Sequence, residues 1–119
     1  MEKRQLQHSE IEFHTNYAIL RVFENEHISL DKARTIFSTL KEYFKNREFI
    51  FISHRVANYT LDLDVLDNFK MNTVRGISIV SSDPEARQRA AHEQDHFDKS
   101  FVFFEDLNDA IDWAKSFFK

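Results

Sequence analysis

Apolar positions along the chain fall into two patterns, short continuous runs and stretches with helical spacing. The runs at residues 49–52, 74–80 and 101–104 predict strands, the first and last of them buried on both faces. Apolar and polar residues alternate over residues 11–13, and a turn separates them from a second strand-like stretch at residues 17–23. Two strands joined this closely predict an antiparallel hairpin. We expect residues 1–9, which show neither pattern, to be frayed or loosely attached.

Helical spacing is clearest from Leu30 to Phe44, where apolar residues recur at steps of three and four after a capping residue, Ser29. Shorter helices are predicted from Asp62 or Asp64 to about residue 69, from Pro84 onward with Ser82 as the capping residue, and from Asp106 to the end. The helix from Pro84 has few apolar positions. Its exposed side is predicted to carry Arg87, Gln88, Arg89, His92 and Glu93.

A hairpin followed by alternating helices and strands predicts parallel pairing through right-handed crossovers. We therefore predict an α/β fold, with a mixed sheet of about five strands, an N-terminal antiparallel hairpin, and helices packed on the sheet. The length of 119 residues and the absence of a linker predict a single domain over residues 1–119. Gly76, inside a predicted strand, indicates a close approach of another part of the chain.

Composition excludes several classes of protein. The chain has no cysteine, which excludes disulfides, thiolate nucleophiles and cysteine-ligated zinc. Its single glycine argues against phosphate-cradling loops, so we expect no nucleotide cofactor. A net charge of −4 without a basic stripe argues against nucleic-acid binding. Apolar runs of four or five residues predict no membrane insertion, and without a signal peptide we expect a cytoplasmic protein.

A dense polar group follows the predicted central strand, at the sheet edge where ligands and partners of α/β proteins bind. Its candidate binding residues are His54, Arg55, Asn58, Tyr59 and Thr60. An arginine and a histidine at a strand end can hold a carboxylate or a phosphate. In the alternative interpretation, Arg55 pairs with a nearby aspartate and Tyr59 packs over the sheet edge.

Residues 92–96 match the HExxH pattern of zinc metalloproteases, in which two histidines one helical turn apart hold the metal and the glutamate is the general base. The candidate ligands are His92 and His96, with Glu93 as the base. A third ligand is missing from the pattern, although Glu105 or Asp106 could supply one. The alternative interpretation is a solvated helix end whose histidines are one turn apart by chance.

Two further groups have both a chemical and a structural interpretation. Asp62, Asp64 and Asp67 could share Mg²⁺ or Ca²⁺, or they could cap a helix and stabilise its dipole. Several phenylalanines could lie on a sheet face that helices leave bare, forming a dimer interface or an apolar ligand site, or they could be ordinary core. These are Phe23, Phe49, Phe51, Phe101 and Phe103.

The chain resembles the STAS-like group, the fold of bacterial anti-sigma-factor antagonists, and especially its uncharacterised SpoIIAA-like branch. The resemblance rests on the order of the elements and on two segments, residues 52–60 after the central strand and residues 104–113 at the end. The resemblance implies a regulatory protein with a phospho-acceptor near the start of the helix after the central strand. Thr60 and Ser53 are the nearest hydroxyls to that place. The loop departs from the family's pattern, since it has neither the Asp-Ser pair nor the glycine.

These observations together predict a non-enzymatic binding or regulatory module of STAS-like fold. It would bind another protein or a small anion through the loop after the central strand. The alternatives are a zinc-dependent hydrolase that uses residues 92–96 and a structural homodimer.

Overall fold

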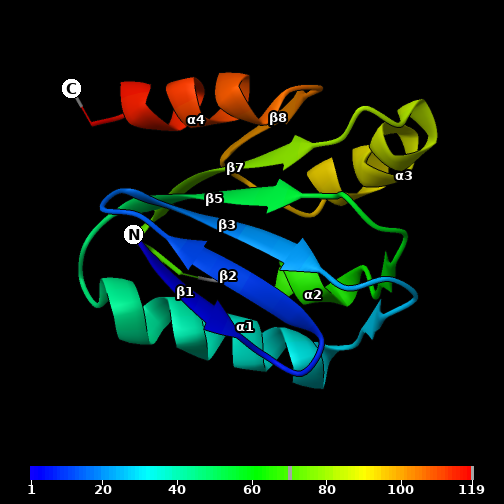
Figure 1. The fold of residues 1–119 in the computed structure, drawn as a ribbon, viewed down its shortest axis with the longest axis horizontal. Helices are drawn as coiled ribbons and strands as arrows, with labels where there is room; N and C mark the ends of the chain where they lie inside the picture. The colour runs from blue at the N-terminus through cyan, green and yellow to red at the C-terminus, as the bar shows by residue number, and fades with distance from the viewer. Residues whose placement is uncertain (70, 119) are drawn as a thin grey trace.

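Six strands form one mixed sheet in the computed structural model, which describes residues 1–69 and 71–118 (Figure 1). The order across the sheet is β1-β2-β3-β5-β7-β8, so neighbours in space follow one another along the chain. Pairing is antiparallel from β1 to β3 and parallel from β3 to β8. The strands are β1 (Glu2–Gln5), β2 (Ser9–Phe13), β3 (Tyr17–Val22), β5 (Phe49–His54), β7 (Val74–Val80) and β8 (Ser100–Phe104). The predicted α/β fold with its N-terminal hairpin is confirmed.

The sixth strand comes from the segment that was expected to be frayed. β1 pairs with β2 from Glu2 opposite Phe13 to Gln5 opposite Glu10, so that expectation is wrong. β1 is an exposed edge strand, and its side chains therefore need no apolar alternation. The Arg4 guanidinium lies 5.7 Å from the Phe13 ring centre, which gives this polar strand a contact with the core.

Two short strands escaped the sequence analysis altogether. β4 (His27–Ile28) and β6 (Thr60–Leu61) form a separate parallel pair beside the main sheet. Strands of two residues carry no periodicity, and their partners lie more than 30 residues apart in the chain. This small sheet joins the loop after β3 to the loop after β5, and so ties down the segment that contains the candidate binding residues.

The described residues also form four helices: α1 (Leu30–Phe44), α2 (Asp64–Asp67), α3 (Pro84–Gln94) and α4 (Leu107–Ser116). Ser29 caps α1 and Asp106 caps α4 as predicted. The cap of α3 is Asp83, whose Oδ1 accepts from the Glu85 amide, instead of Ser82. α2 has no side-chain cap, so the expected capping by Asp62 or Asp64 is wrong.

Helices cover both faces of the sheet, with α1 and α4 on opposite sides in Figure 1. Parallel strands added in one direction through right-handed crossovers place α1, α2 and α3 on the same face. There they enclose the larger core, which includes Phe49, Phe51 and Phe101, so of the two interpretations of these phenylalanines ordinary core is the one that the structure shows. Phe23, by contrast, is exposed. α4 encloses a smaller core on the other face.

Gly76 lies on β7, on the face that α4 covers. A Cβ built at this position would lie 3.1 Å from Cη2 of Trp113 on α4 and 3.2 Å from the carbonyl oxygen of Ser100 on β8. The close approach predicted from this glycine is therefore confirmed.

Candidate functional site

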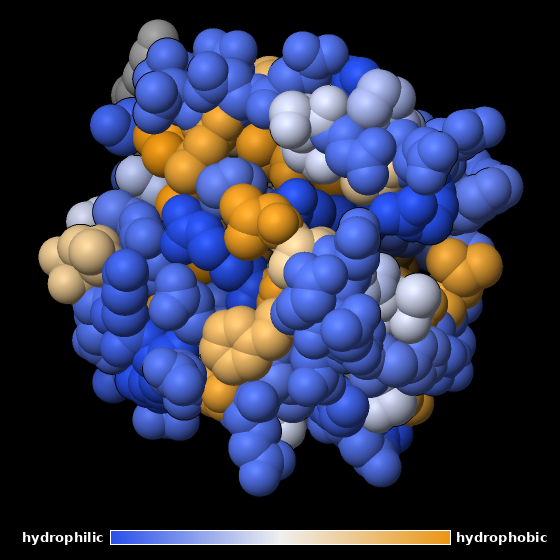
Figure 2. Space-filling view, turned by 45° about the vertical axis from the view of Figure 1, so that its right-hand side comes forward, coloured by the Kyte–Doolittle hydropathy of each residue, from blue (hydrophilic) through white to orange (hydrophobic). Residues whose placement is uncertain are grey.

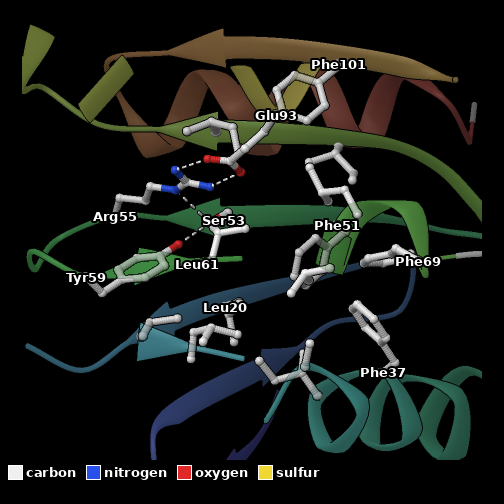
Figure 3. A pocket seen from close by; sticks show the side chains of 18 residues that line it. Leu20, Phe37, Phe51, Ser53, Arg55, Tyr59, Leu61, Phe69, Glu93 and Phe101 are labelled. Carbon is white, nitrogen blue, oxygen red and sulfur yellow. Dashed lines mark hydrogen bonds and ion pairs between the residues drawn. The ribbon is translucent and has the colours of Figure 1, made fainter. Parts of the chain in front are cut away.

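Arg55, the first residue after β5, forms a buried ion pair with Glu93 on α3. Nη1 and Nη2 of the guanidinium donate to the two carboxylate oxygens at 2.7 and 2.5 Å, a bidentate arrangement (Figure 3). The exposed fractions of the two side chains are 10% and 7%. Arg55 is therefore not free to hold an external anion. The alternative interpretation, pairing with a carboxylate, describes its environment, with a glutamate in place of the expected aspartate.

The charge of Arg55 is maintained despite its burial. Burial alone would lower the pKa of the guanidinium, but Tyr59 and Glu93 raise it above its ordinary value. The Tyr59 ring centre lies 5.4 Å from Cζ of Arg55, a cation–π contact. The arginine thus stays protonated at any physiological pH, and Glu93 compensates the buried positive charge.

Two hydroxyls lie beside this ion pair. Ser53 Oγ accepts from Nε of Arg55 at 3.3 Å and lies 3.3 Å from the hydroxyl of Tyr59. Ser53 is only 4% exposed. A kinase has no access to it in this conformation, so of the two predicted phospho-acceptors only Thr60 lies at the surface.

His54 points to the opposite face of the sheet from Arg55, because successive side chains of a strand alternate. Its Nδ1 accepts from Nε of Arg21 at 3.1 Å, and Arg21 also contacts Glu12 and Glu10. Burial and then Arg21 lower the pKa of His54, while Glu12 raises it less. His54 therefore belongs to a polar cluster on β2, β3 and β5 that is separate from Arg55.

Asn58 and Thr60 lie in the exposed part of the loop, where β4 and β6 hold them. The Asn58 carbonyl accepts from the Asn25 amide, and Thr60 Oγ1 lies 2.6 Å from Nδ1 of His27. Nε2 of the same histidine lies 2.8 Å from Asp62. The five predicted binding residues therefore do not converge on one ligand. They divide between a buried ion pair, the opposite sheet face and an exposed loop.

The HExxH residues are not arranged as a metal site. α3 ends at Gln94, so His96 lies beyond the helix, and its Nδ1 is 2.9 Å from Asp67. His92 is exposed, whereas Glu93 points into the core toward Arg55. Within residues 1–69 and 71–118, the structure brings together no group of three or more histidines and carboxylates that could hold a metal ion. The same holds for Asp62, Asp64 and Asp67.

Glu93 is the residue of this ion pair that the sequence analysis misplaced, because it was assigned to the exposed side of its helix. A pattern in the sequence could have located it. Ala86, Ala90 and Glu93 follow one another at steps of four and three, and these three residues form the buried stripe of α3. A carboxylate in such a stripe requires a partner, and Arg55 at the end of a buried strand is a suitable one.

Two exposed apolar side chains, Phe23 and Val56, follow the neighbouring parallel strands β3 and β5 at the same edge of the sheet. The large apolar residues that are most exposed, apart from Met1, are Phe23, Val56 and Leu63, which follow β3, β5 and β6. Figure 2 shows apolar atoms among hydrophilic ones on the side of the molecule where these loops lie. Val56, with an exposed fraction of 64%, borders a hollow of about 370 Å³ between residues 54–58 and 80–83.

The rim of this hollow is acidic. Glu24, Asp83 and Glu105 line it, and Glu26 and Glu85 line the adjoining depression around Tyr59. Of the basic residues nearby, Arg55 pairs with Glu93, Arg87 with Glu105 at 3.2 Å and Lys32 with Glu26 at 2.9 Å. Arg89 also lines the depression around Tyr59, but Glu24, Asp83 and Glu85, which line the two hollows, outnumber it. Such a surface favours a positively charged partner over an anion.

Comparisons with known proteins support the fold. One solved structure that the chain resembles is an uncharacterised protein of the DUF3478 family with a SpoIIAA-like fold, from Shewanella loihica PV-4. The match covers 93% of this chain and 98% of the other, with a TM-score of 0.59 and 16% sequence identity. The fold is therefore SpoIIAA-like, as the sequence resemblance implied. No family model matches the chain, and no curated protein matches it either.

A helix that crosses a bilayer must be both long and apolar. Among the described residues, no helix meets both requirements for crossing a membrane.

Proposed function

We propose that this protein is a non-enzymatic binding module that captures a protein partner at the edge of the sheet where β3, β5 and β7 end. The observation that supports this best is the exposure of two apolar side chains, Phe23 and Val56, after adjacent parallel strands, with Glu24 and Asp83 lining the hollow beside Val56. Apolar side chains within a charged rim are typical of protein interfaces.

The buried ion pair gives this surface its rigidity. Arg55 is fixed by Glu93 through two hydrogen bonds, and its backbone amide donates to the carbonyl of Val80 on the neighbouring strand. Val56 is the next residue in the chain, so its exposed side chain projects from an anchored backbone. A preorganised loop loses less conformational entropy on binding than a mobile one.

The charge of the rim selects the partner. A basic protein surface complements Glu24, Asp83 and Glu85, whereas a small anion would meet these carboxylates and find Arg55 already paired with Glu93. We therefore favour a protein partner with an apolar contact surrounded by lysine and arginine over the small-anion alternative. Thr60, exposed beside this surface, stays a predicted phospho-acceptor whose modification would add negative charge there.

The test is capture of a partner from an extract of the source organism by immobilised wild-type protein and two variants. Val56→Asp places a charge in the centre of the apolar surface, and Asn72→Asp adds the same charge to an exposed loop residue at the opposite end of β7. We expect Val56→Asp to abolish capture and Asn72→Asp to retain it. Capture should also weaken as salt is raised. Equal capture by all three proteins, or capture that is insensitive to salt, would contradict the proposal.

A further inference from the structure

The main sheet ends in two edge strands, β1 and β8, which differ in how they are protected (Figure 1). An edge strand presents unpaired backbone N–H and C=O groups, and native proteins usually blunt it with charged side chains or proline. β1 follows this rule, because three of its four residues are Glu2, Lys3 and Arg4. β8 does not follow it, since residues 100–104 include no charge and no proline, and four of the five are apolar. β8 is therefore the edge that is open to a further strand.

Two residues of β8 turn their backbone groups away from the sheet. The Phe104 carbonyl accepts from the amide of Ser81, the residue after β7, and backbone direction alternates along a strand, so Phe101 and Phe103 face outward. Among the described residues, one group bonds to them on that side, Nε2 of Gln94, which lies 3.4 Å from the Phe101 carbonyl oxygen. This distance is beyond the usual range for such a bond. The two amides and the Phe103 carbonyl are left for solvent or for another strand.

The sequence of this edge is complementary to itself. Two copies of β8 related by a two-fold axis pair antiparallel, and an axis at Val102 overlaps all five residues of each strand. In that register Phe101 of each copy lies opposite Phe103 of the other, as a pair that exchanges both N–H···O bonds. Outward-facing backbone groups thus meet outward-facing groups. The two Val102 side chains lie directly opposite each other, on the face of the sheet that α4 covers.

Charges flank the strand in an order that suits the same register. Lys99 precedes β8 and Glu105 follows it, so Lys99 of each copy lies opposite Glu105 of the other, and opposed charges of this kind stabilise a strand pair. Nζ of Lys99 donates to backbone carbonyls, the nearest being that of Val74 at 2.8 Å, and has no carboxylate partner among the described residues. The chain bends at residue 99 and at residues 105–106, so the two strands part before Asp98 meets Asp106.

We propose that β8 is the interface of a symmetric homodimer, in which two six-stranded sheets join through β8 into one continuous sheet. A second copy of the chain fits this edge better than an unrelated extended segment, because it supplies the apolar strand and both charged pairs together. The contact is small, so we expect a dissociation constant on the order of 10 µM. The dimer does not depend on the surface proposed for the protein partner, since Phe23 and Val56 follow β3 and β5.

The test is the molar mass in solution, measured by analytical ultracentrifugation at protein concentrations from about 1 µM to 1 mM. We expect the mass to rise from the chain value of 14.3 kDa toward twice that value. Val102→Lys places two like charges together at the two-fold axis and should abolish dimerisation. Gln5→Lys adds the same charge to the exposed edge strand β1 and should leave dimerisation unchanged. A monomer at every concentration, or a dimer that survives Val102→Lys, would overturn the proposal.

A charge exchange tests the register even if Val102→Lys fails to fold. Lys99→Glu and Glu105→Lys each place like charges opposite each other twice in the dimer, and each should weaken dimerisation about tenfold. The double variant restores both opposed pairs and should dimerise within about twofold of the wild type. Circular dichroism and thermal midpoints separate loss of dimerisation from loss of folding. Folded single variants that dimerise as the wild type does, or a folded double variant that recovers nothing, would also overturn the proposal.

Discussion

The ion pair between Arg55 and Glu93 gives the sharpest quantitative prediction. Both side chains are almost fully buried, and each makes two hydrogen bonds to the other. Glu93→Gln keeps the shape of the side chain but leaves the Arg55 charge without its counter-ion in the core. Removing one partner of a buried pair costs about 3–5 kcal/mol of the free energy of unfolding.

Replacing both members with apolar residues should cost much less than replacing one. In Arg55→Met with Glu93→Leu, no charge remains to be desolvated, and similar volumes fill the space. We therefore expect the free energy of unfolding of the double variant to lie within about 1–2 kcal/mol of the wild-type value. The losses measured for Arg55→Met alone and Glu93→Leu alone should then add up to about 3 kcal/mol or more above the loss in the double variant.

The assay is urea unfolding followed by circular dichroism, analysed as a two-state transition. The matched control is the exposed pair Arg75–Glu48, at 3.3 Å with exposed fractions of 42% and 54%. Glu48→Gln should change the free energy of unfolding by less than about 0.5 kcal/mol. A cost below about 1 kcal/mol for Glu93→Gln, or additive effects of the two core substitutions, would refute the reasoning.

The remaining predictions concern pH and packing. Stability should fall as the pH is lowered from about 7.5 to 5.5, because the pKa of His54 lies below its ordinary value of 6.5 and the unfolded chain therefore takes up the proton first. His54→Gln should reduce this loss, measured from urea midpoints at both pH values; an unchanged pH dependence would contradict it. His8, with a pKa lowered mainly by burial, adds a residual effect of the same sign. Gly76→Ala should destabilise the protein by about 1–3 kcal/mol, because the new methyl group meets Trp113 and the Ser100 carbonyl; a thermal midpoint equal to that of the wild type would show that α4 can move aside.

The sequence was informative wherever a local pattern decides the structure. The helical spacing from Leu30 to Phe44 with Ser29 before it, and the apolar runs of β5 and β8, were enough to predict the elements and their parallel order. β1 could not be predicted, because an exposed edge strand of polar residues is held by the backbone of β2 and has no pattern of its own. At the end of α1 the residue with positive φ is Lys45, although asparagine, the next residue in the chain, adopts that conformation more readily.

The candidate site was predicted only in its location along the chain. Residues 54–60 do lie at the sheet edge, but the side chains were assumed to share one surface. Strand alternation separates His54 from Arg55, and the partner of Arg55 lies 38 residues further on, in a helix whose other residues are mostly polar. Periodicity within one element does not predict a pairing of this kind between two elements.

The match between strand order in space and in the chain has a consequence for how the molecule assembles. Each new strand can dock on the last one already in place, so the sheet can grow from β1 toward β8 as the chain leaves the ribosome. Arg55 arrives early in that sequence and Glu93 late, after β7 has docked. Until α3 is made, the arginine must remain hydrated, and the core beneath it cannot close. The ion pair therefore makes final compaction of this face conditional on synthesis of α3.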